Sequence, residues 1–343
     1  MTASTSRNRI LIAAPLDAAH ITEIREAAPD CDITVVDPYP RGATLPVELI
    51  ADREILFADF APANIEAMQD LAWIQLGSAG YAQLQGLPLK SMGTRATNAS
   101  GVNDIPIAEW CLLMMLAFER SLPDLFQVQQ QRGWDRAARF QTELRGRRVG
   151  ILGYGNIGRE VARLSQALGL DVWALNRHPV GPTPLKFTPA GTGDPEGAIP
   201  SRAFTVDQLP AFLPHLDYLV MTAALNGRTR GLIGEAELRL LPVHAVILNP
   251  ARAHLIDEKA LQRALGDGWI RGAAIDSHYR EPLAPDDPAW DVPNVILTPH
   301  ISGSTLSPRY TDRLTELFRR NLDRFQRGQP LLNEISWEDL SAN

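Results

Sequence analysis

Three glycine residues have a spacing that could bind the phosphates of a dinucleotide: Gly153, Gly155 and Gly158 form the pattern G-x-G-x-x-G. In this pattern the first glycine permits a tight turn, the second lets the backbone approach a pyrophosphate, and the third allows a helix to pack closely on a strand. The backbone N–H groups that begin the helix, at Asn156 and Ile157, would then face the negative charge. A plain glycine-rich turn is the alternative interpretation.

The residues around the three glycines predict a strand, a turn, a helix and a second strand. Residues 149–152 form a short apolar run of the kind found in buried parallel strands, and residues 171–175 form a second one. Between them, apolar residues recur at helical steps of three and four: Ile157, Val161, Leu164 and Leu168. This arrangement places the glycines at a strand-to-helix turn and therefore favours dinucleotide binding over a plain turn.

The residues after the second strand bear on the choice between NAD and NADP. Proteins that bind NAD usually carry an acidic residue there, which binds the ribose 2′-hydroxyl. This chain has Asn176 and Arg177 instead, and a guanidinium can pair with a 2′-phosphate as a planar fork. The sequence therefore predicts NADP as the cofactor, with NAD as the alternative if Arg177 is simply a solvated loop residue.

Polar residues follow four further apolar runs, which we expect to be strands of the same sheet. The runs cover 216–221, 245–248, 270–275 and 294–297, and their polar tails are Thr222, Asn249 to Arg252, Asp276 and Thr298 to His300. In an open α/β sheet, ligands bind outside the carboxyl ends of the strands. These tails are therefore predicted to converge on the cofactor.

The N-terminal part of the chain predicts a separate α/β domain without a nucleotide motif. After its fourth expected strand, Ser78, Ala79 and Gly80 could present successive N–H groups as an anion-binding nest, although a plain turn is equally compatible. Residues 180–202, rich in glycine and proline, predict an extended surface loop. The expected strands are 9–14, 32–36, 54–58, 73–76 and 95–98, and the expected helices are 17–28, 63–69 and 105–120.

Composition limits the classes of function. With 343 residues the chain is long enough for two domains that share a cleft. Its net charge of −7, without a basic block, argues against a nucleic-acid surface. Two cysteines provide neither a disulfide framework nor a zinc site, so no metal is expected, and no apolar run is long enough for a membrane span. The N-terminus lacks a signal-peptide pattern, so the expected location is the cytoplasm.

Several ordered motifs give the chain a resemblance to the D-isomer-specific 2-hydroxyacid dehydrogenase family along nearly its whole length. They are GYGNIG, NPARAHLIDEKAL at 249–261, AIDSHYREPL at 274–283 and NVILTPHISG at 294–303. The resemblance implies an α/β fold of two domains, each a doubly wound parallel sheet. A flavodoxin-like substrate-binding domain would comprise 1–101 plus 304–343, and a Rossmann dinucleotide-binding domain, 102–303, would be inserted in it. The resemblance also implies a homodimer formed through the nucleotide domain.

The same resemblance assigns three catalytic positions. It makes His300 the acid/base, Glu281 its acidic partner and Arg252 the substrate-binding arginine. Histidine suits the proton transfer that must accompany a hydride, because it titrates near neutral pH. A neighbouring carboxylate orients the ring and favours its charged form, and arginine can hold a carboxylate while it polarises the adjacent carbonyl.

The resemblance also assigns positions that line the ligands. Asp276 would face the nicotinamide, and Thr222 and Asn249 would line the cofactor. The glycine-rich nest of the N-terminal domain would bind the substrate carboxylate together with Arg252 and His300. Walls of the substrate pocket would come from variable residues such as Phe57, Phe60, Tyr81 and Trp134.

The predicted reaction is reduction by NADP(H) of a small 2-oxo acid, of the glyoxylate or hydroxypyruvate kind. Two other classes stay open: a dehydrogenase of formate or phosphite, and a non-catalytic regulator that senses NAD(P)H. Formate dehydrogenases of this type carry glutamine where Glu281 stands, and phosphite dehydrogenases carry lysine at the position of Ala79, so both residues favour the 2-oxo acid. The chain departs from the family pattern at Ala253, usually glycine, and at Ser277 and His278, usually an apolar pair. These departures leave the substrate itself unnamed.

Overall fold

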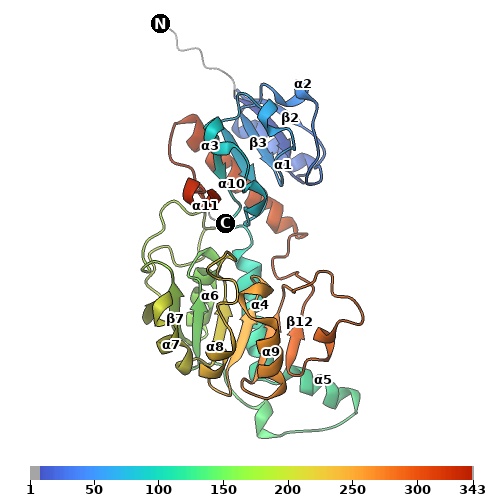
Figure 1. The fold of residues 1–343 in the computed structure, drawn as a ribbon, viewed down its shortest axis with the longest axis vertical. Coiled ribbons are helices and arrows are strands. Elements are labelled where there is room, and N and C mark those ends of the chain that lie inside the picture. The colour runs from blue at the N-terminus through green and yellow to red at the C-terminus, as the bar shows by residue number, and fades with distance from the viewer. Residues whose placement is uncertain (1–7, 342–343) are drawn as a thin grey trace. The chain divides into compact units, whose positions relative to one another are not determined.

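The computed structural model describes residues 8–341, which form two compact units (Figure 1). Unit 1 holds Leu185–Pro189 together with the described residues of Met1–Val102 and Leu306–Asn343. Unit 2 comprises Asn103–Pro184 and Ala190–Thr305. Residues 1–7, on which the expectation of no leader segment partly depends, lie outside the described residues. Among residues 8–341 no helix has both the length and the apolar character that crossing a membrane requires.

Unit 1 is built on a parallel sheet of five strands within its described residues, in the order β2-β1-β3-β4-β5. This is the flavodoxin-like order, in which the chain reverses direction across the sheet between β1 and β3. Helices α1 and α10 supply apolar side chains to one face, and α2, α3 and α11 supply them to the other. The strands are β1 (Arg9–Ala13), β2 (Asp32–Val35), β3 (Ile55–Ala58), β4 (Trp73–Leu76) and β5 (Arg95–Thr97). The helices are α1 (Ala18–Ala27), α2 (Val47–Ile50), α3 (Leu89–Met92), α10 (Pro308–Gln326) and α11 (Trp337–Ser341).

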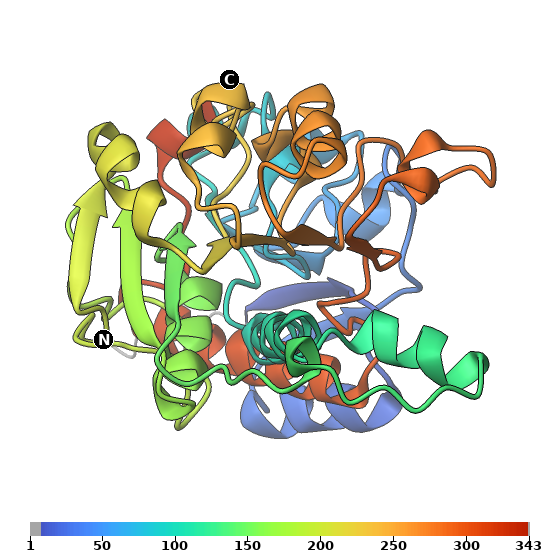
Figure 2. The same cartoon turned by 90° about the horizontal axis from the view of Figure 1, so that it is seen from below.

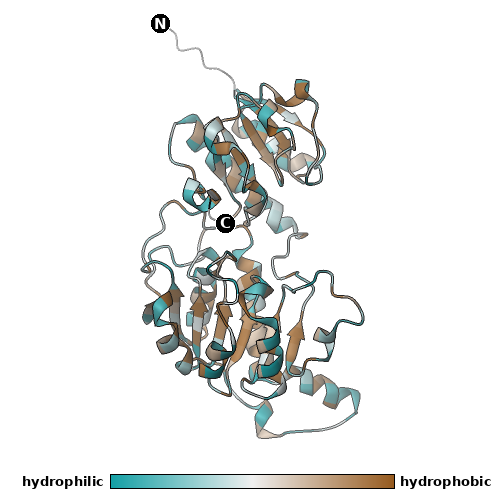
Figure 3. Cartoon of the chain, in the orientation of Figure 1, coloured by the Kyte–Doolittle hydropathy of each residue, from teal (hydrophilic) through white to brown (hydrophobic). Residues whose placement is uncertain are grey.

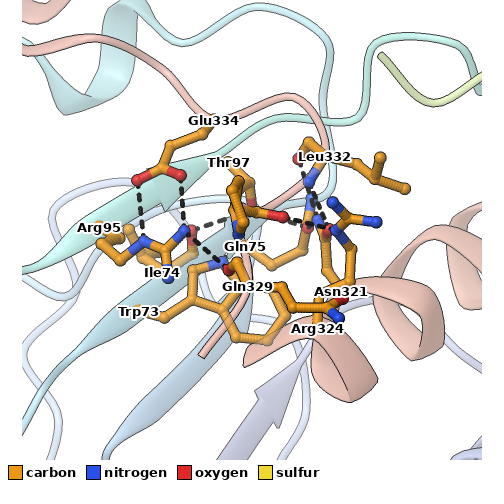
Figure 4. Close-up of polar contacts among 11 residues, drawn as sticks. Trp73, Ile74, Gln75, Arg95, Thr97, Asn321, Arg324, Gln329, Leu332 and Glu334 are labelled. Atoms are coloured by element: carbon orange, nitrogen blue, oxygen red, sulfur yellow. Dashed lines mark hydrogen bonds and ion pairs between the residues drawn. The ribbon is translucent and has the colours of Figure 1, made fainter. Parts of the chain in front are cut away.

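A buried polar network joins the long helix α10 to the sheet of unit 1 (Figure 4). Asn321 on α10 accepts a hydrogen bond from the backbone N–H of Leu332 at 2.7 Å and donates to the carbonyl of Leu332 at 3.1 Å. Its amide also donates to Gln75 on β4 at 3.2 Å, and Gln75 accepts from Thr97 on β5 at 2.7 Å. The residues after α10 are thereby held on the sheet formed by the N-terminal part of the chain.

We expect Asn321→Leu to destabilise the protein, because it leaves the N–H and carbonyl of Leu332 without their partner inside the core. Each of these two buried polar groups costs about 1–3 kcal/mol when it is left unpaired, so the expected loss in the free energy of unfolding is about 2–6 kcal/mol. Denaturant unfolding followed by circular dichroism measures it. Asp323→Leu, at an exposed position of the same helix, is the matched control and should change stability by less than about 1 kcal/mol. Equal stability of both variants would contradict the role given to the network.

Unit 2 is built on a parallel sheet of seven strands within its described residues, in the order β12-β11-β10-β9-β6-β7-β8. Six of these strands, from β11 to β8, follow the order of a Rossmann sheet, and β12 extends it at one edge. Helices α4 and α6 pack on one face, and α7, α8 and α9 pack on the other (Figure 2). The strands are β6 (Arg148–Leu152), β7 (Asp171–Asn176), β8 (Arg202–Thr205), β9 (Tyr218–Met221), β10 (Val246–Asn249), β11 (Gly272–Ile275) and β12 (Val295–Leu297). The helices are α4 (Asp104–Glu119), α5 (Leu122–Gln130), α6 (Asn156–Ala167), α7 (Leu209–Phe212), α8 (Glu235–Leu240) and α9 (Glu258–Gly266).

Apolar side chains concentrate on the strands of both sheets, as their hydropathy shows (Figure 3). Because each sheet is covered by helices on two faces, its strands are apolar runs rather than alternating patterns. This is why short apolar runs predict most of the strands within two or three residues.

Two predictions about helices and loops differ from the structure. Residues 63–69 do not form an α-helix; only the short 3-10 helix Ile65–Ala67 is present, because the side chain of Asn64 is bound to the backbone of Leu45 at 2.9 and 3.1 Å. Residues 180–202 lack helices and strands up to β8, as expected, but they are not simply a surface loop. Phe187 lies fully buried in the core of unit 1, and Asp194 is buried in unit 2.

Candidate active site

The glycine turn of unit 2 has the geometry that a pyrophosphate requires. Gly153 has φ +100°, and a Cβ atom there would lie 2.5 Å from the backbone nitrogen of Ala223. A Cβ on Gly158 would overlap the carbonyl oxygen of Gly153, so helix α6 approaches the end of β6 as closely as backbone allows. At Gly155, by contrast, a Cβ would meet nothing within 4 Å. The first and third glycines are thus required by packing, and the second opens a space at the first turn of α6, where the N–H groups of a helix attract phosphate.

Side chains around this turn fix its position. The hydroxyl of Thr222, after β9, donates to the carbonyl of Gly153 at 2.6 Å. The phenol of Tyr154 donates to Asp194 at 2.7 Å, and burial together with that carboxylate raises the pKa of Tyr154. Buried Arg159 on α6 donates to the carbonyls of Asp194 and Gly181, the latter at 2.8 Å. The segment that follows β7 is therefore tied to the helix that begins at the glycine turn.

The end of β7 carries the two residues predicted to select the cofactor. Asn176 ends the strand, and its amide donates to the carbonyl of His178 at 3.1 Å. Arg177 and His178 are exposed, and the guanidinium of Arg177 donates to the ring of His178 at 2.9 Å. No carboxylate occupies residues 176–178, so a phosphate approaching this strand end would meet a cation rather than an anion.

His300 and Glu281 form a hydrogen-bonded pair in unit 2. Nδ1 of His300 lies 2.9 Å from Oε2 of Glu281, and the two side chains are 42% and 38% exposed. Oε1 of the same carboxylate accepts the backbone N–H of His278 at 2.7 Å. Burial acts to raise the pKa of Glu281, but the hydrogen bonds from His278 and His300 outweigh it and hold this pKa below its usual range. Glu281 is therefore ionised at neutral pH, and Nε2 of His300 is directed away from its partner.

Asp276 holds the loop that presents His300. Its carboxylate is fully buried at the end of β11 and accepts the hydroxyl of Thr298 at 2.5 Å. It also accepts the backbone N–H groups of Ile301 at 3.0 Å and Ser302 at 2.9 Å. His300 itself has φ +55°, a conformation that non-glycine residues seldom adopt, so the loop needs such anchoring. A contact between Asp276 and the nicotinamide stays a prediction.

Arg252 is exposed on the loop after β10, and Asn249 shapes that loop. The fully buried amide of Asn249 donates to the carbonyl of Arg252 at 2.9 Å and accepts the N–H of Ala251 at 3.1 Å. The guanidinium of Arg252 donates to the carbonyl of Ala251 at 2.7 Å. Asn249 thus presents Arg252 at the carboxyl end of the sheet. The predicted contact of Asn249 with the cofactor stays a prediction.

In unit 1, the turn after β4 contains the residues of the predicted nest, Ser78, Ala79 and Gly80. Its carbonyl groups are occupied: Tyr310 donates to that of Gly77, Asn98 donates to that of Ala79 at 2.9 Å, and the Ser78 hydroxyl donates to that of Gly80 at 2.9 Å. Among residues 8–341, the N–H groups of residues 78–80 donate to no acceptor within the protein. These N–H groups are available to an anion.

Among residues 8–341, no group of three His, Cys, Asp or Glu side chains is arranged to hold a metal ion.

Comparison with known proteins identifies the chain. Residues 112–302 match the model of the D-isomer specific 2-hydroxyacid dehydrogenase, NAD binding domain. The chain belongs to the D-isomer specific 2-hydroxyacid dehydrogenase family. It is 30% identical to a glyoxylate reductase of Aeropyrum pernix over 254 residues, which cover 72% of this chain and 71% of that protein. It is 29% identical to a glyoxylate reductase of Thermofilum pendens over 309 residues, which cover 87% and 86%.

A solved structure agrees with this assignment. A D-isomer specific 2-hydroxyacid dehydrogenase family protein of Aeromonas salmonicida superposes with a TM-score of 0.77 at 26% identity, covering 96% of this chain and 99% of that one. The predicted family and the predicted two-sheet α/β fold are confirmed. The chain is therefore an oxidoreductase, an NAD(P)-dependent D-2-hydroxyacid dehydrogenase with an NAD-binding domain.

Two features of the dehydrogenase's site lie outside what the sequence predicts. Phe57, predicted as a wall of the substrate pocket, is fully buried and stacks on Phe318 of α10 with ring centroids 4.4 Å apart, so that prediction is wrong. Ser277 and His278 make side-chain hydrogen bonds to Ala253 and Thr298, whereas the sequence marked them only as departures from the family pattern. The signal that points to them is that polar residues replace an apolar pair directly after a strand end.

Proposed function

We propose that this dehydrogenase reduces a small 2-oxo acid to the D-2-hydroxy acid with NADPH, using His300 as the acid, Glu281 as its partner and Arg252 to hold the substrate. The observation that carries the proposal is the 2.9 Å contact between His300 and an ionised Glu281 at the strand ends of a nucleotide-binding sheet. The glyoxylate reductases at 30% and 29% identity support a small 2-oxo acid as the substrate.

The reduced nicotinamide, when bound, supplies the hydride that reaches the carbonyl carbon of the substrate. Protonated His300 then gives the proton on Nε2 to the carbonyl oxygen, while Nδ1 keeps its hydrogen bond to Glu281. The ionised carboxylate of Glu281 accepts the hydrogen bond from Nδ1 and so keeps the ring oriented before and after the transfer. Arg252 binds the substrate carboxylate and polarises the adjacent carbonyl, where negative charge develops.

The remaining site residues take binding roles in the proposal. The N–H groups of Ser78, Ala79 and Gly80 bind the substrate carboxylate, which makes residues 1–101 plus 304–343 the substrate-binding domain. Residues 102–303 form the dinucleotide-binding domain. The pyrophosphate is held at the glycine turn, by Gly153, Gly155, Asn156, Ile157 and Gly158, and Thr222, Asn249 and Asp276 line the rest of the cofactor.

A substrate panel tests the function. NADPH consumption, followed by absorbance, is measured with glyoxylate, hydroxypyruvate, pyruvate and larger 2-oxo acids. Formation of NADPH or NADH from the oxidised cofactor is measured with formate and phosphite. We expect turnover with at least one small 2-oxo acid and none with formate or phosphite. Turnover only with formate or phosphite, or with no substrate of either kind, would contradict the proposal.

The same enzyme is expected to prefer NADPH to NADH. Arg177 can donate a charge-assisted hydrogen bond to the 2′-phosphate, which contributes about 1.5–3 kcal/mol, or roughly ten- to a hundredfold in affinity. Because Arg177 is exposed, solvent screens this interaction, and we expect kcat/KM for NADPH to exceed that for NADH by roughly tenfold. The double variant Asn176→Asp, Arg177→Ala should favour NADH, because the new carboxylate binds a 2′-hydroxyl and repels a phosphate.

Kinetics with both cofactors measure this preference. Arg309→Ala removes an arginine that is 81% exposed on α10 of unit 1, and it should leave the ratio of the two kcat/KM values unchanged. A wild-type enzyme that uses NADH as efficiently as NADPH would return Arg177 to the role of a solvated loop residue.

We also propose that the enzyme is a homodimer formed through unit 2. Apolar side chains lie exposed on α4, on α5 and after them: Leu113, Leu116, Phe126 and Trp134, which are 54%, 43%, 56% and 91% exposed. Helix α5 has no buried residue, so its own unit does not explain its apolar positions. Light scattering of the wild type should give twice the mass of one chain. The double variant Leu113→Asp, Phe126→Asp should give the mass of a single chain. Val47→Asp, with the same exposure as Leu113 but in unit 1, is the control, and a monomeric wild type would refute the dimer.

A further inference from the structure

Ser277 and His278 connect the three segments that carry the proposed catalytic residues. They follow Asp276 directly at the end of β11. The buried hydroxyl of Ser277 accepts the backbone N–H of Ala253, the residue after Arg252, at 3.3 Å. The ring of His278 reaches the segment of His300, and the backbone of His278 reaches Glu281. Each of the three segments is therefore bonded to this dipeptide.

The contacts of His278 lie closest to the proposed chemistry. Its backbone N–H donates to Oε1 of Glu281 at 2.7 Å, while Nδ1 of His300 binds Oε2 of the same carboxylate at 2.9 Å. Its Nε2 lies 2.8 Å from the carbonyl oxygen of Thr298, and that oxygen also accepts the backbone N–H of His300 at 2.9 Å. Because a carbonyl can only accept, the His278 ring carries its proton on Nε2 in this contact. One residue thus fixes the carboxylate and the backbone of its histidine partner together.

We propose that His278 is a positioning residue that holds Glu281 and His300 in register, an inference that rests on the proposed function. An apolar residue, usual at this position in the family, keeps the backbone bond to Glu281 but has no bond to Thr298. In this chain the backbone of His278 binds Glu281, and its ring binds the carbonyl of Thr298 in the segment that carries His300. The ring therefore ties the two segments together. The side chains of Glu281 and His300 are exposed to solvent, so packing by neighbouring side chains does not fix their positions. The hydrogen bond of His278 supplies part of the restraint that packing would give.

The surroundings of His278 allow the anchor to be removed without unfolding the loop. His278 lines a cavity whose other walls are largely apolar, among them Leu261, Ile275 and Leu297, so a leucine at 278 can pack there. The outer part of the loop is held independently. The Tyr279 hydroxyl donates to the carbonyl of Ile256 at 2.9 Å, and Arg280 pairs with Asp287 at 2.8 Å.

The test compares His278→Leu with His278→Gln, whose amide nitrogen can take the place of Nε2. A displaced catalytic pair lowers the rate of the chemical step, so kcat should fall roughly ten- to a hundredfold in His278→Leu and recover to within roughly threefold of wild type in His278→Gln. KM for the 2-oxo acid and the Kd of NADPH should change little in both variants. His244→Leu, at an exposed histidine elsewhere in unit 2, controls for the loss of an imidazole. A kcat for His278→Leu equal to that of wild type, or equal losses in the two His278 variants, would overturn the inference.

An NMR measurement decides the inference without any substrate. In protein labelled with 15N-histidine, the Nδ1–H of His300 bound to a carboxylate gives a low-field proton signal, assigned by its loss in His300→Ala. We expect this signal in wild type and in His278→Gln, and its loss or broadening in His278→Leu. An unchanged signal in His278→Leu would overturn the inference. If the wild-type enzyme reduces no 2-oxo acid while the signal behaves as expected, the proposed function fails and the positioning contact stands.

Discussion

Replacing His300 with alanine is expected to lower kcat for 2-oxo acid reduction about a hundred- to ten-thousandfold, the usual cost of losing a general acid. The structure gives this residue the contacts that the role requires. Its Nδ1 is bound to Glu281 at 2.9 Å, and its backbone is set by the loop that Asp276 anchors. Nδ1 of the ring is therefore bound to Glu281, and Nε2 is the nitrogen that the proposed mechanism uses for the substrate. Stopped-flow and steady-state measurements of NADPH oxidation determine the change.

The affinity for NADPH should change little in His300→Ala, because the proposed site of the phosphates is the glycine turn and not this loop. Fluorescence titration of NADPH measures that affinity separately from turnover. His244→Ala, an exposed histidine at the opposite end of β10 from Arg252, is the matched control and should behave as wild type. If His300→Ala reduced 2-oxo acids at near-normal rates, the histidine would have no part in proton transfer.

Arg252→Lys is expected to raise KM for the 2-oxo acid strongly and to lower kcat as well. Lysine keeps the positive charge but presents a single ammonium, which cannot bind a carboxylate with two parallel hydrogen bonds while it polarises the carbonyl. A hydrogen bond to a charged group contributes about 1.5–3 kcal/mol, so the loss in kcat/KM should be roughly ten- to a hundredfold. The fixed loop makes the change local, because Asn249 binds the backbone and not the guanidinium of Arg252.

Two comparisons make the arginine experiment specific. Arg309→Lys, at an exposed arginine on α10, should leave both constants unchanged. A substrate analogue without the carboxylate should be turned over equally poorly by wild type and by Arg252→Lys. Wild-type constants for Arg252→Lys with every accepted 2-oxo acid would show that the guanidinium does not hold the substrate.

The sequence predicts the parts of the site that local pattern determines. Parallel strands buried on both faces are short apolar runs, and their polar tails lie at one edge of the sheet. For this reason Asn249, Asp276 and the segment of His300 could be placed from the chain alone. The glycine turn is predictable because each glycine answers a separate steric need, as the positions of Gly153 and Gly158 show.

Contacts between distant residues could not be predicted in this way. An apolar strand does not reveal which residue faces a helix far along the chain. The sequence therefore predicts Phe57 as a pocket wall, whereas in the structure it stacks on Phe318. The helix expected at 63–69 does not form because Asn64 binds backbone groups 19 residues away. The three hydrogen bonds accepted by Asp276 come from residues at least 22 positions later. These bonds make Asp276 an anchor for the His300 loop, a role that the sequence does not predict.

The proposed reaction passes a hydride from NADPH to the 2-oxo carbon while His300 protonates the oxygen. It is tested most directly with NADPH deuterated at either face of C4, hydroxypyruvate as substrate, and analysis of the glycerate by chiral chromatography and mass spectrometry. We predict that one of the two labelled cofactors transfers deuterium to C2 of D-glycerate, and that His300→Ala forms this product at least about a hundredfold more slowly. Label that stays on the cofactor with both deuterated forms, product of the L configuration, or equal formation by His300→Ala would contradict the mechanism.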